Sequence, residues 1–125
     1  MFTILLIDNR NTIQSVVKYL LYRYDLVYCN NPDDAADIIE KNNIDMIIVN
    51  LPFSPGCGDQ VNKLTGWIKK KKTIAILEMV IPQVVEQAKE WGVLEYLDKM
   101  DIGRLPRVVN RHLNQASTRI LNING

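Results

Sequence analysis

Residues 44–58, IDMIIVNLPFSPGCG, constrain the fold of this chain more than any other stretch. Five of the first six residues are apolar, which predicts a strand over Met46–Val49 that is buried on both faces of a sheet. The run stops at Asn50, before a loop that contains Pro52, Pro55, Gly56 and Gly58. Since α/β sheets bind ligands beyond the carboxyl ends of their strands, Asn50 is a candidate functional residue.

The length and composition favour one compact domain. The 125 residues are 47% hydrophobic, and we expect a domain over residues 1–121 with residues 122–125 as a tail or the start of a linker. With 15 basic and 14 acidic side chains the net charge is only +1, so no overall field attracts nucleic acid or an anionic membrane. No apolar run approaches the ~20 residues of a membrane span, and no signal peptide is recognisable, so a cytoplasmic location is expected. Cys29 and Cys57 are expected to be free thiols.

Five apolar runs alternate with segments of helical periodicity. The other four predicted strands lie in Phe2–Ile7, Leu26–Cys29, Thr73–Leu77 and Val93–Leu97. Helices are predicted over residues 13–21, 32–41, 59–70, 82–91 and 105–120. Asn11 is expected to cap the first helix, Asn31 the second, and Gly92 to close the fourth. This (βα)5 pattern predicts a parallel sheet with right-handed crossovers and helices on both faces.

Polar residues follow the predicted strands at the same edge of this sheet. The residues at these strand ends, most of them polar, are Asp8, Asn9, Cys29, Asn30, Asn50, Glu78, Met79 and Lys99. Together with the stretches LLIDNR, AILEM and EYLDKM, these positions resemble the response-regulator receiver domain of two-component signalling over about Phe2–Leu113. The resemblance implies a flavodoxin-like three-layer sandwich with strand order 2-1-3-4-5.

The resemblance also assigns roles to residues. Asp8 and Asn9 stand at the metal-binding acidic pair, and Asn50 stands at the phosphorylated aspartate. Glu78 occupies the position of the switch threonine or serine, while Tyr96 and Lys99 match the rotating aromatic residue and the lysine.

The departures from the receiver pattern remove its usual chemistry. The amide of Asn50 is a poor nucleophile, and Asn9 removes a second carboxylate, so the formal charge of the acidic trio falls from about −3 to about −1. We therefore expect no acyl phosphate, no cofactor, and at most a weak Mg²⁺ site at Asp8. Met100 replaces the proline that commonly follows the lysine, which puts the usual cis peptide bond there in doubt.

Glu78 is the departure with the clearest structural consequence. We hypothesise that its carboxylate pairs with Lys99 and substitutes internally for the aspartate or phosphate contact, which locks one conformation. The alternative is that Glu78 points into water.

Other residues are candidates for partner contacts. In receivers the face of the fourth helix, fifth strand and fifth helix binds output domains or a second copy, and here it would carry Gln83, Glu86, Gln87, Glu90, Tyr96 and Arg107. Trp91 either anchors that face or fills the core, and the latter is favoured. The basic cluster Lys69–Lys72, with Lys63 and Trp67 nearby, is interpreted as solvated rather than as a nucleic-acid site, and His112 as a helix residue rather than a base.

The sequence thus predicts a degenerate pseudo-receiver that acts in signal transduction by phosphorylation-independent protein–protein interaction and is not an enzyme. One alternative is a conventional phosphorelay receiver of a transcription regulator, in an engineered or weakly phosphorylated form. A flavodoxin-like cofactor binder is a further alternative, but the loop DNRNTIQ has no glycine to wrap a phosphate.

Overall fold

The computed structural model describes residues 1–52, 65, 66 and 68–114 of the chain. Five strands form one parallel sheet in the order β2-β1-β3-β4-β5. They are β1 (Thr3–Ile7), β2 (Asp25–Cys29), β3 (Met46–Leu51), β4 (Thr73–Leu77) and β5 (Glu95–Asp98). This order and the parallel pairing confirm the predicted flavodoxin-like fold.

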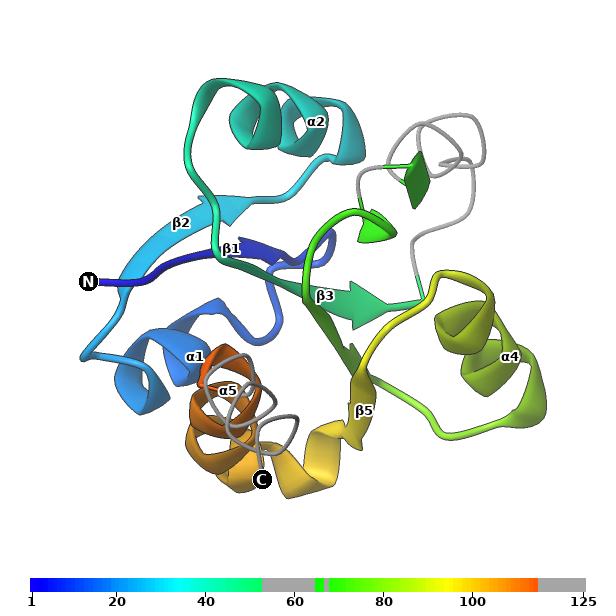
Figure 1. The fold of residues 1–125 in the computed structure, drawn as a ribbon. Helices are drawn as coiled ribbons and strands as arrows, with labels where there is room; N and C mark the ends of the chain where they lie inside the picture. The colour runs from blue at the N-terminus through cyan, green and yellow to red at the C-terminus, as the bar shows by residue number, and fades with distance from the viewer. Residues whose placement is uncertain (53–64, 67, 115–125) are drawn as a thin grey trace, which may run out of the picture.

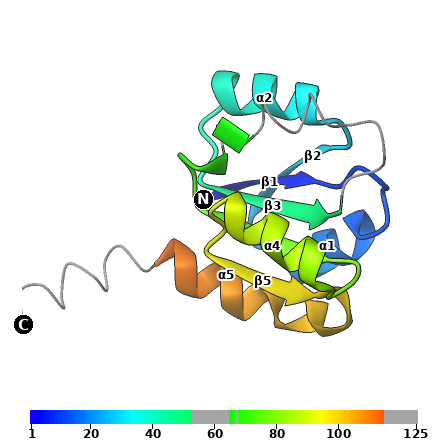
Figure 2. The same cartoon turned by 90° about the vertical axis from the view of Figure 1, so that its right-hand side faces the viewer.

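Helices cover both faces of the sheet (Figures 1 and 2). The described helices are α1 (Gln14–Leu20), α2 (Pro32–Lys41), α4 (Pro82–Glu90), the 3₁₀ helix η1 (Lys99–Arg104) and α5 (Leu105–Leu113). α1 and α5 pack on one face, where Val17 and Val109 join a buried cluster with Ile48. α2 and α4 pack on the other, where Ile39 and Ala88 join a second cluster with Val49. The chain therefore forms a three-layer sandwich with one core on each face.

The central strands have the continuous apolar sequences that burial on two faces requires. All six residues of β3 and all five of β4 are buried. Asn50 lies within β3 as its penultimate residue, so the prediction that the strand stops before Asn50 was wrong by two residues. β5 was predicted within Val93–Leu97, and it ends one residue later, at Asp98.

Helix starts were predicted with mixed success. The side chain of Asn31 accepts a hydrogen bond from the Asp33 amide at 2.8 Å and caps α2, as expected. Asn11 does not cap α1: its φ is 55°, and the residue at the N-cap is Ile13, which makes no side-chain cap. A carboxylate oxygen of Asp8 instead accepts the Ile13 amide at 2.8 Å. A buried acid at the end of β1 thus fixes the start of α1.

Several predictions lie outside the described residues. They concern Pro55, Gly56, Cys57, Gly58, Lys63, Trp67, most of the helix predicted over 59–70, the last helix beyond residue 114, and the tail 122–125. Among the described residues, no helix is long and apolar enough to cross a membrane.

Candidate functional site

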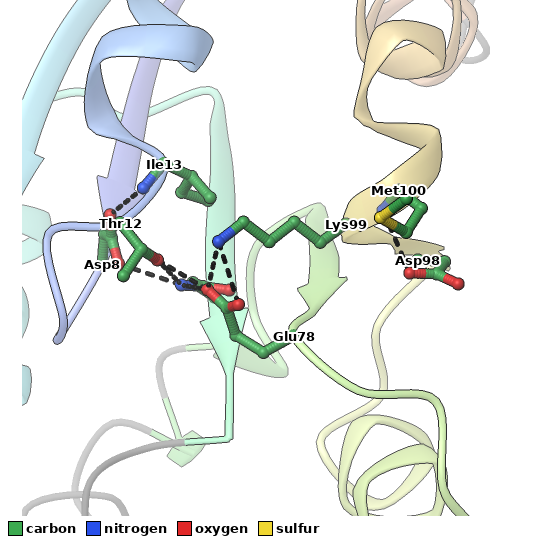
Figure 3. A network of polar contacts seen from close by, with 8 residues as sticks. Asp8, Thr12, Ile13, Glu78, Asp98, Lys99 and Met100 are labelled. Atoms are coloured by element: carbon green, nitrogen blue, oxygen red, sulfur yellow. Dashed lines mark hydrogen bonds and ion pairs between the residues drawn. The ribbon is translucent and has the colours of Figure 1, made fainter.

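The polar residues predicted from the strand ends meet at the carboxyl end of the sheet (Figure 3). Asp8 follows β1, Glu78 follows β4 and Lys99 follows β5, while Asn50 projects from β3 between them. The ladder holds this arrangement, because the Glu78 amide donates to the Leu51 carbonyl at 2.8 Å and Asn50 pairs with Ile76. The sequence therefore identified the carboxyl end of the sheet as the place where these residues meet, and it identified four of the residues that interact there.

The amide of Asn50 is the centre of the network. Its nitrogen Nδ2 lies 3.0 Å from Oδ1 of Asp8, 3.1 Å from Oγ1 of Thr12 and 2.9 Å from Oε1 of Glu78. Reversing the amide would set its oxygen against two carboxylates, so chemistry favours the orientation with nitrogen toward them. Oδ1 of Asn50 is buried and has no hydrogen-bond partner among the described residues. Asn50 thus acts here as a donor between two acids.

Asp8 is buried, and both oxygens of its carboxylate accept hydrogen bonds from within the protein. Only 2% of the residue is exposed, and its two carboxylate oxygens accept from the Ile13 amide and from Asn50. Both oxygens on which a cation would depend are therefore already hydrogen-bonded.

Glu78 takes the opposite side of the Asn50 amide and binds Lys99. Nζ of Lys99 lies 3.1 Å from Oε2 and 3.3 Å from Oε1 of Glu78, and the Thr12 hydroxyl donates to Oε1 at 2.6 Å. The predicted Glu78–Lys99 pair is confirmed, and the alternative that Glu78 points into water is wrong. Burial acts to raise the pKa of Glu78, but the hydrogen bonds from Thr12, Asn50 and Lys99, with the charge of Lys99, outweigh it and lower that pKa.

Three other predicted positions lie outside this network. Nδ2 of Asn9 donates to the Asn30 carbonyl at 3.3 Å, so it joins the loops after β1 and β2. Tyr96 is 39% exposed on β5, and Met100 is 87% exposed. The single cis peptide bond among the described residues is Leu51–Pro52, so the bond after Lys99 is trans.

The donor set is a poor match for Mg²⁺, which prefers oxygen ligands and carboxylates. Asn50 presents nitrogen, each oxygen of Asp8 already accepts a hydrogen bond, and the ammonium of Lys99 lies against the second acid. Among the residues that the structure describes, no group of three or more histidine, cysteine, aspartate or glutamate side chains is arranged to hold a metal ion.

Thr12 is the residue of the site that the sequence did not reveal. It lies in the β1–α1 loop and bonds to Glu78, 66 residues away. A threonine in a polar loop gives no periodic or compositional signal, so only the position of the loop relative to β4 could have identified it.

A second polar cluster lies at the opposite end of β5. Glu95 forms an ion pair with Arg111, and Oε1 of Glu95 lies 3.2 Å from Nε2 of His112. His112 belongs to α5 and is 8% exposed, so it is a packed helix residue, as predicted. Lys72 donates to the His112 carbonyl at 2.7 Å, and Lys71 donates to that of Ile44 at 3.1 Å. Two lysines of the basic cluster are therefore engaged within the protein.

Neither a protein-family model nor a curated protein sequence matches the chain. Several solved structures, in contrast, match the fold of the chain. A CheY-like response regulator receiver domain protein from Methanospirillum hungatei JF-1 has a TM-score of 0.78 at 15% identity, with 95% of this chain and 98% of that chain covered. A response regulator receiver domain protein from Clostridium thermocellum has a TM-score of 0.73 at 21% identity, with 94% and 98% covered. The response regulator TrrA from Thermotoga maritima, solved in complex with Mg²⁺ and BeF, has a TM-score of 0.70 at 21% identity, with 89% and 98% covered. The chain therefore has the fold of response-regulator receiver domains.

Proposed function

We propose that this chain is a pseudo-receiver, a signal-transduction module that works by protein–protein contact and does not depend on phosphorylation. The observation that carries this proposal is the bonding of Glu78 to Lys99, Thr12 and Asn50 at the end of the sheet where the receiver fold does its chemistry. A carboxylate supplied by the chain itself takes the contacts that would otherwise be available to an incoming anion.

The chemistry of Asn50 argues against phosphoryl transfer. An acyl phosphate requires a carboxylate oxygen that attacks phosphorus, whereas Asn50 directs an amide nitrogen with a delocalised lone pair toward Asp8 and Glu78. Asp8 is no substitute, because both its oxygens accept internal hydrogen bonds. The module is thus proposed to bind partners without catalytic turnover and to have at most weak affinity for Mg²⁺.

The face formed by α4, β5 and α5 is the proposed partner surface. Its predicted polar residues Gln83, Glu86, Glu90 and Arg107 are exposed, and Gln87 is partly exposed. Next to them lie exposed apolar side chains, namely Met79, Val80, Ile81, Tyr96 and Met100. Trp91 is 5% exposed and fills the core, so it is not an anchor. A mixed apolar and charged surface of this kind suits a protein partner, an output domain or a second copy better than nucleic acid. The cytoplasmic location stays a prediction.

The test is incubation with acetyl phosphate and Mg²⁺, followed by intact-mass measurement. We expect no adduct of about 80 Da, the mass of one phosphoryl group. A stable adduct would support the conventional phosphorelay receiver instead. An absorbance scan of the purified protein tests the flavodoxin-like alternative, because bound flavin absorbs visible light. The pseudo-receiver proposal predicts no flavin absorbance.

A further inference from the structure

The outer edge of β2 is unpaired. β2 forms its ladder with β1 alone, and the described part of the chain supplies no second neighbour. The Asp25 amide donates to the Phe2 carbonyl and the Cys29 carbonyl accepts from Asp8, so Asp25 and Cys29 turn their backbone groups toward β1. Because successive residues of a strand alternate, Leu26 and Tyr28 direct their N–H and C=O groups outward. These groups form a template for a further strand.

A groove with a cavity volume of about 640 Å³ lies along this outer edge of β2. Its lining includes Tyr28 and Cys29 of β2 and Asp34, Asp37, Ile38 and Lys41 of α2. Figure 1 shows β2 as the outermost strand on this side of the sheet, with α2 above it and α1 below. The edge is therefore accessible and bordered by a helix that can contact an added segment.

The charges along the groove favour a basic occupant. Asp34 and Asp37 are exposed on α2, and among the described residues of the lining these two exposed acids outnumber the exposed cation, Lys41. A second copy of this chain would bring the same excess of negative charge, so like charges oppose self-association through this edge.

Tyr28 adds a polar group that needs a partner. Its hydroxyl oxygen is buried and has no hydrogen bond among the described residues. Burial raises the pKa of Tyr28, so the hydroxyl stays protonated and can donate. Cys29 offers no such group, because its thiol donates to the Asn31 carbonyl at 2.8 Å.

We propose that the edge of β2 binds an extended, basic peptide segment of another protein by strand addition. The outward backbone groups of Leu26 and Tyr28 are two residues apart, about 7 Å, which matches the spacing of groups along a partner strand. The segment's Lys or Arg side chains lie over Asp34 and Asp37, and the Tyr28 hydroxyl donates to one of its oxygen acceptors. This site lies on the opposite edge of the sheet from β5 and is independent of the α4-β5-α5 surface.

The probe is the capped peptide acetyl-Lys-Val-Lys-Val-Lys-Thr-amide, titrated into the ¹⁵N-labelled chain. Its controls are the same peptide with Glu for each Lys and a version with Pro for the second Val. The Lys peptide should slow hydrogen exchange at the Leu26 and Tyr28 amides about tenfold or more at millimolar concentration, and neither control peptide should do so. No slowing with the Lys peptide, or equal slowing with the Glu peptide, would overturn the proposal. Slowing that depends on protein concentration alone would assign the edge to a second copy and would also overturn it.

Variants of the chain separate the contribution of the two aspartates to peptide binding from that of the Tyr28 hydroxyl. Asp34→Asn with Asp37→Asn should weaken binding of the Lys peptide about fivefold or more, whereas Glu40→Gln, an exposed α2 acid outside the groove lining, should leave it unchanged. Tyr28→Phe should weaken binding without lowering the melting temperature, because it removes an unpartnered hydroxyl. Equal affinity of the double aspartate variant and the Glu40 control would refute the assigned charge contacts.

Discussion

Lys99 binds Glu78 and not Asn50, with Nζ 3.1 Å from Oε2 of the glutamate. Glu78 in turn accepts from Asn50 and Thr12, so residues after β4 and β5 are joined to β3 and to the β1–α1 loop. One acidic side chain therefore ties together four segments that are distant in sequence. The consequences of this arrangement can be tested one bond at a time.

Glu78→Gln should lower the free energy of unfolding by about 1–3 kcal/mol, measured by urea denaturation. The neutral amide keeps the size of the side chain but loses the charge that three donors share. Lys99 is 36% exposed and can turn to water, which keeps the loss below that of a fully buried pair. Glu86→Gln is the matched control, since its pair with Lys89 is 3.8 Å long and 66% exposed at the glutamate, and it should change stability by less than about 0.5 kcal/mol. Equal effects of the two variants would contradict the structural role of Glu78.

The same bond should make stability depend on pH. The pKa of Glu78 is lowered in the folded protein from a usual value of 4.5, so its stabilisation is present above pH 4.5 and is lost as pH falls through the folded-state pKa. The difference in unfolding free energy between the unsubstituted chain and Glu78→Gln should therefore be constant near neutral pH and shrink below pH 4.5. A difference that stays constant down to strongly acidic pH would show that the charge of Glu78 contributes nothing.

The strands were predictable because burial on two faces demands continuous apolar runs, as in β3 and β4. The location of the site was predictable for a related reason, since parallel strands bring Asp8, Asn50, Glu78 and Lys99 to one edge. The direction in which each side chain points was not predictable from the sequence. That Asp8 bonds to the Ile13 amide and that Thr12 reaches Glu78 depend on the path of the β1–α1 loop, which no local pattern specifies.

The end of β5 illustrates a different limit. The prediction over Val93–Leu97 followed the apolar residues, but the strand begins at Glu95, in the middle of that range, and ends at Asp98. Glu95 is accommodated because Arg111 and His112 of α5 face it, a long-range compensation that hydropathy does not encode.

Glu95→Gln should lower the free energy of unfolding by about 1–2 kcal/mol. Burial acts to raise the pKa of Glu95, but hydrogen bonds from His112 and Arg111 and their charges lower it, so the carboxylate is favoured in the folded state. The loss should be largest near neutral pH and should fade below pH 4.5, as for Glu78. Thermal denaturation across pH checks this, with Glu90→Gln, an exposed α4 acid, as the control. A loss that is unchanged at acidic pH would point to packing rather than charge.

Restoring an acid at the centre of the site gives the sharpest test of the proposed function. Asn50→Asp replaces a donor between Asp8 and Glu78 by a third carboxylate, so without metal it should lower the free energy of unfolding by about 2 kcal/mol or more. Millimolar Mg²⁺ should then raise the melting temperature of Asn50→Asp but not that of the unsubstituted chain, because bound metal stabilises only a site that can hold it.

Glu78→Thr added to Asn50→Asp separates the two residues. Removing Glu78 frees Lys99 and relieves one of the three like charges, so the double variant should be more stable than Asn50→Asp without metal. If Glu78 is what occupies the site, the double variant should also form the adduct of about 80 Da with acetyl phosphate and Mg²⁺, which the unsubstituted chain should not. Stabilisation of the unsubstituted chain by Mg²⁺ to the same degree as Asn50→Asp would refute the role assigned to Asn50. An adduct in Asn50→Asp as abundant as in the double variant would instead show that Glu78 does not hinder phosphoryl transfer.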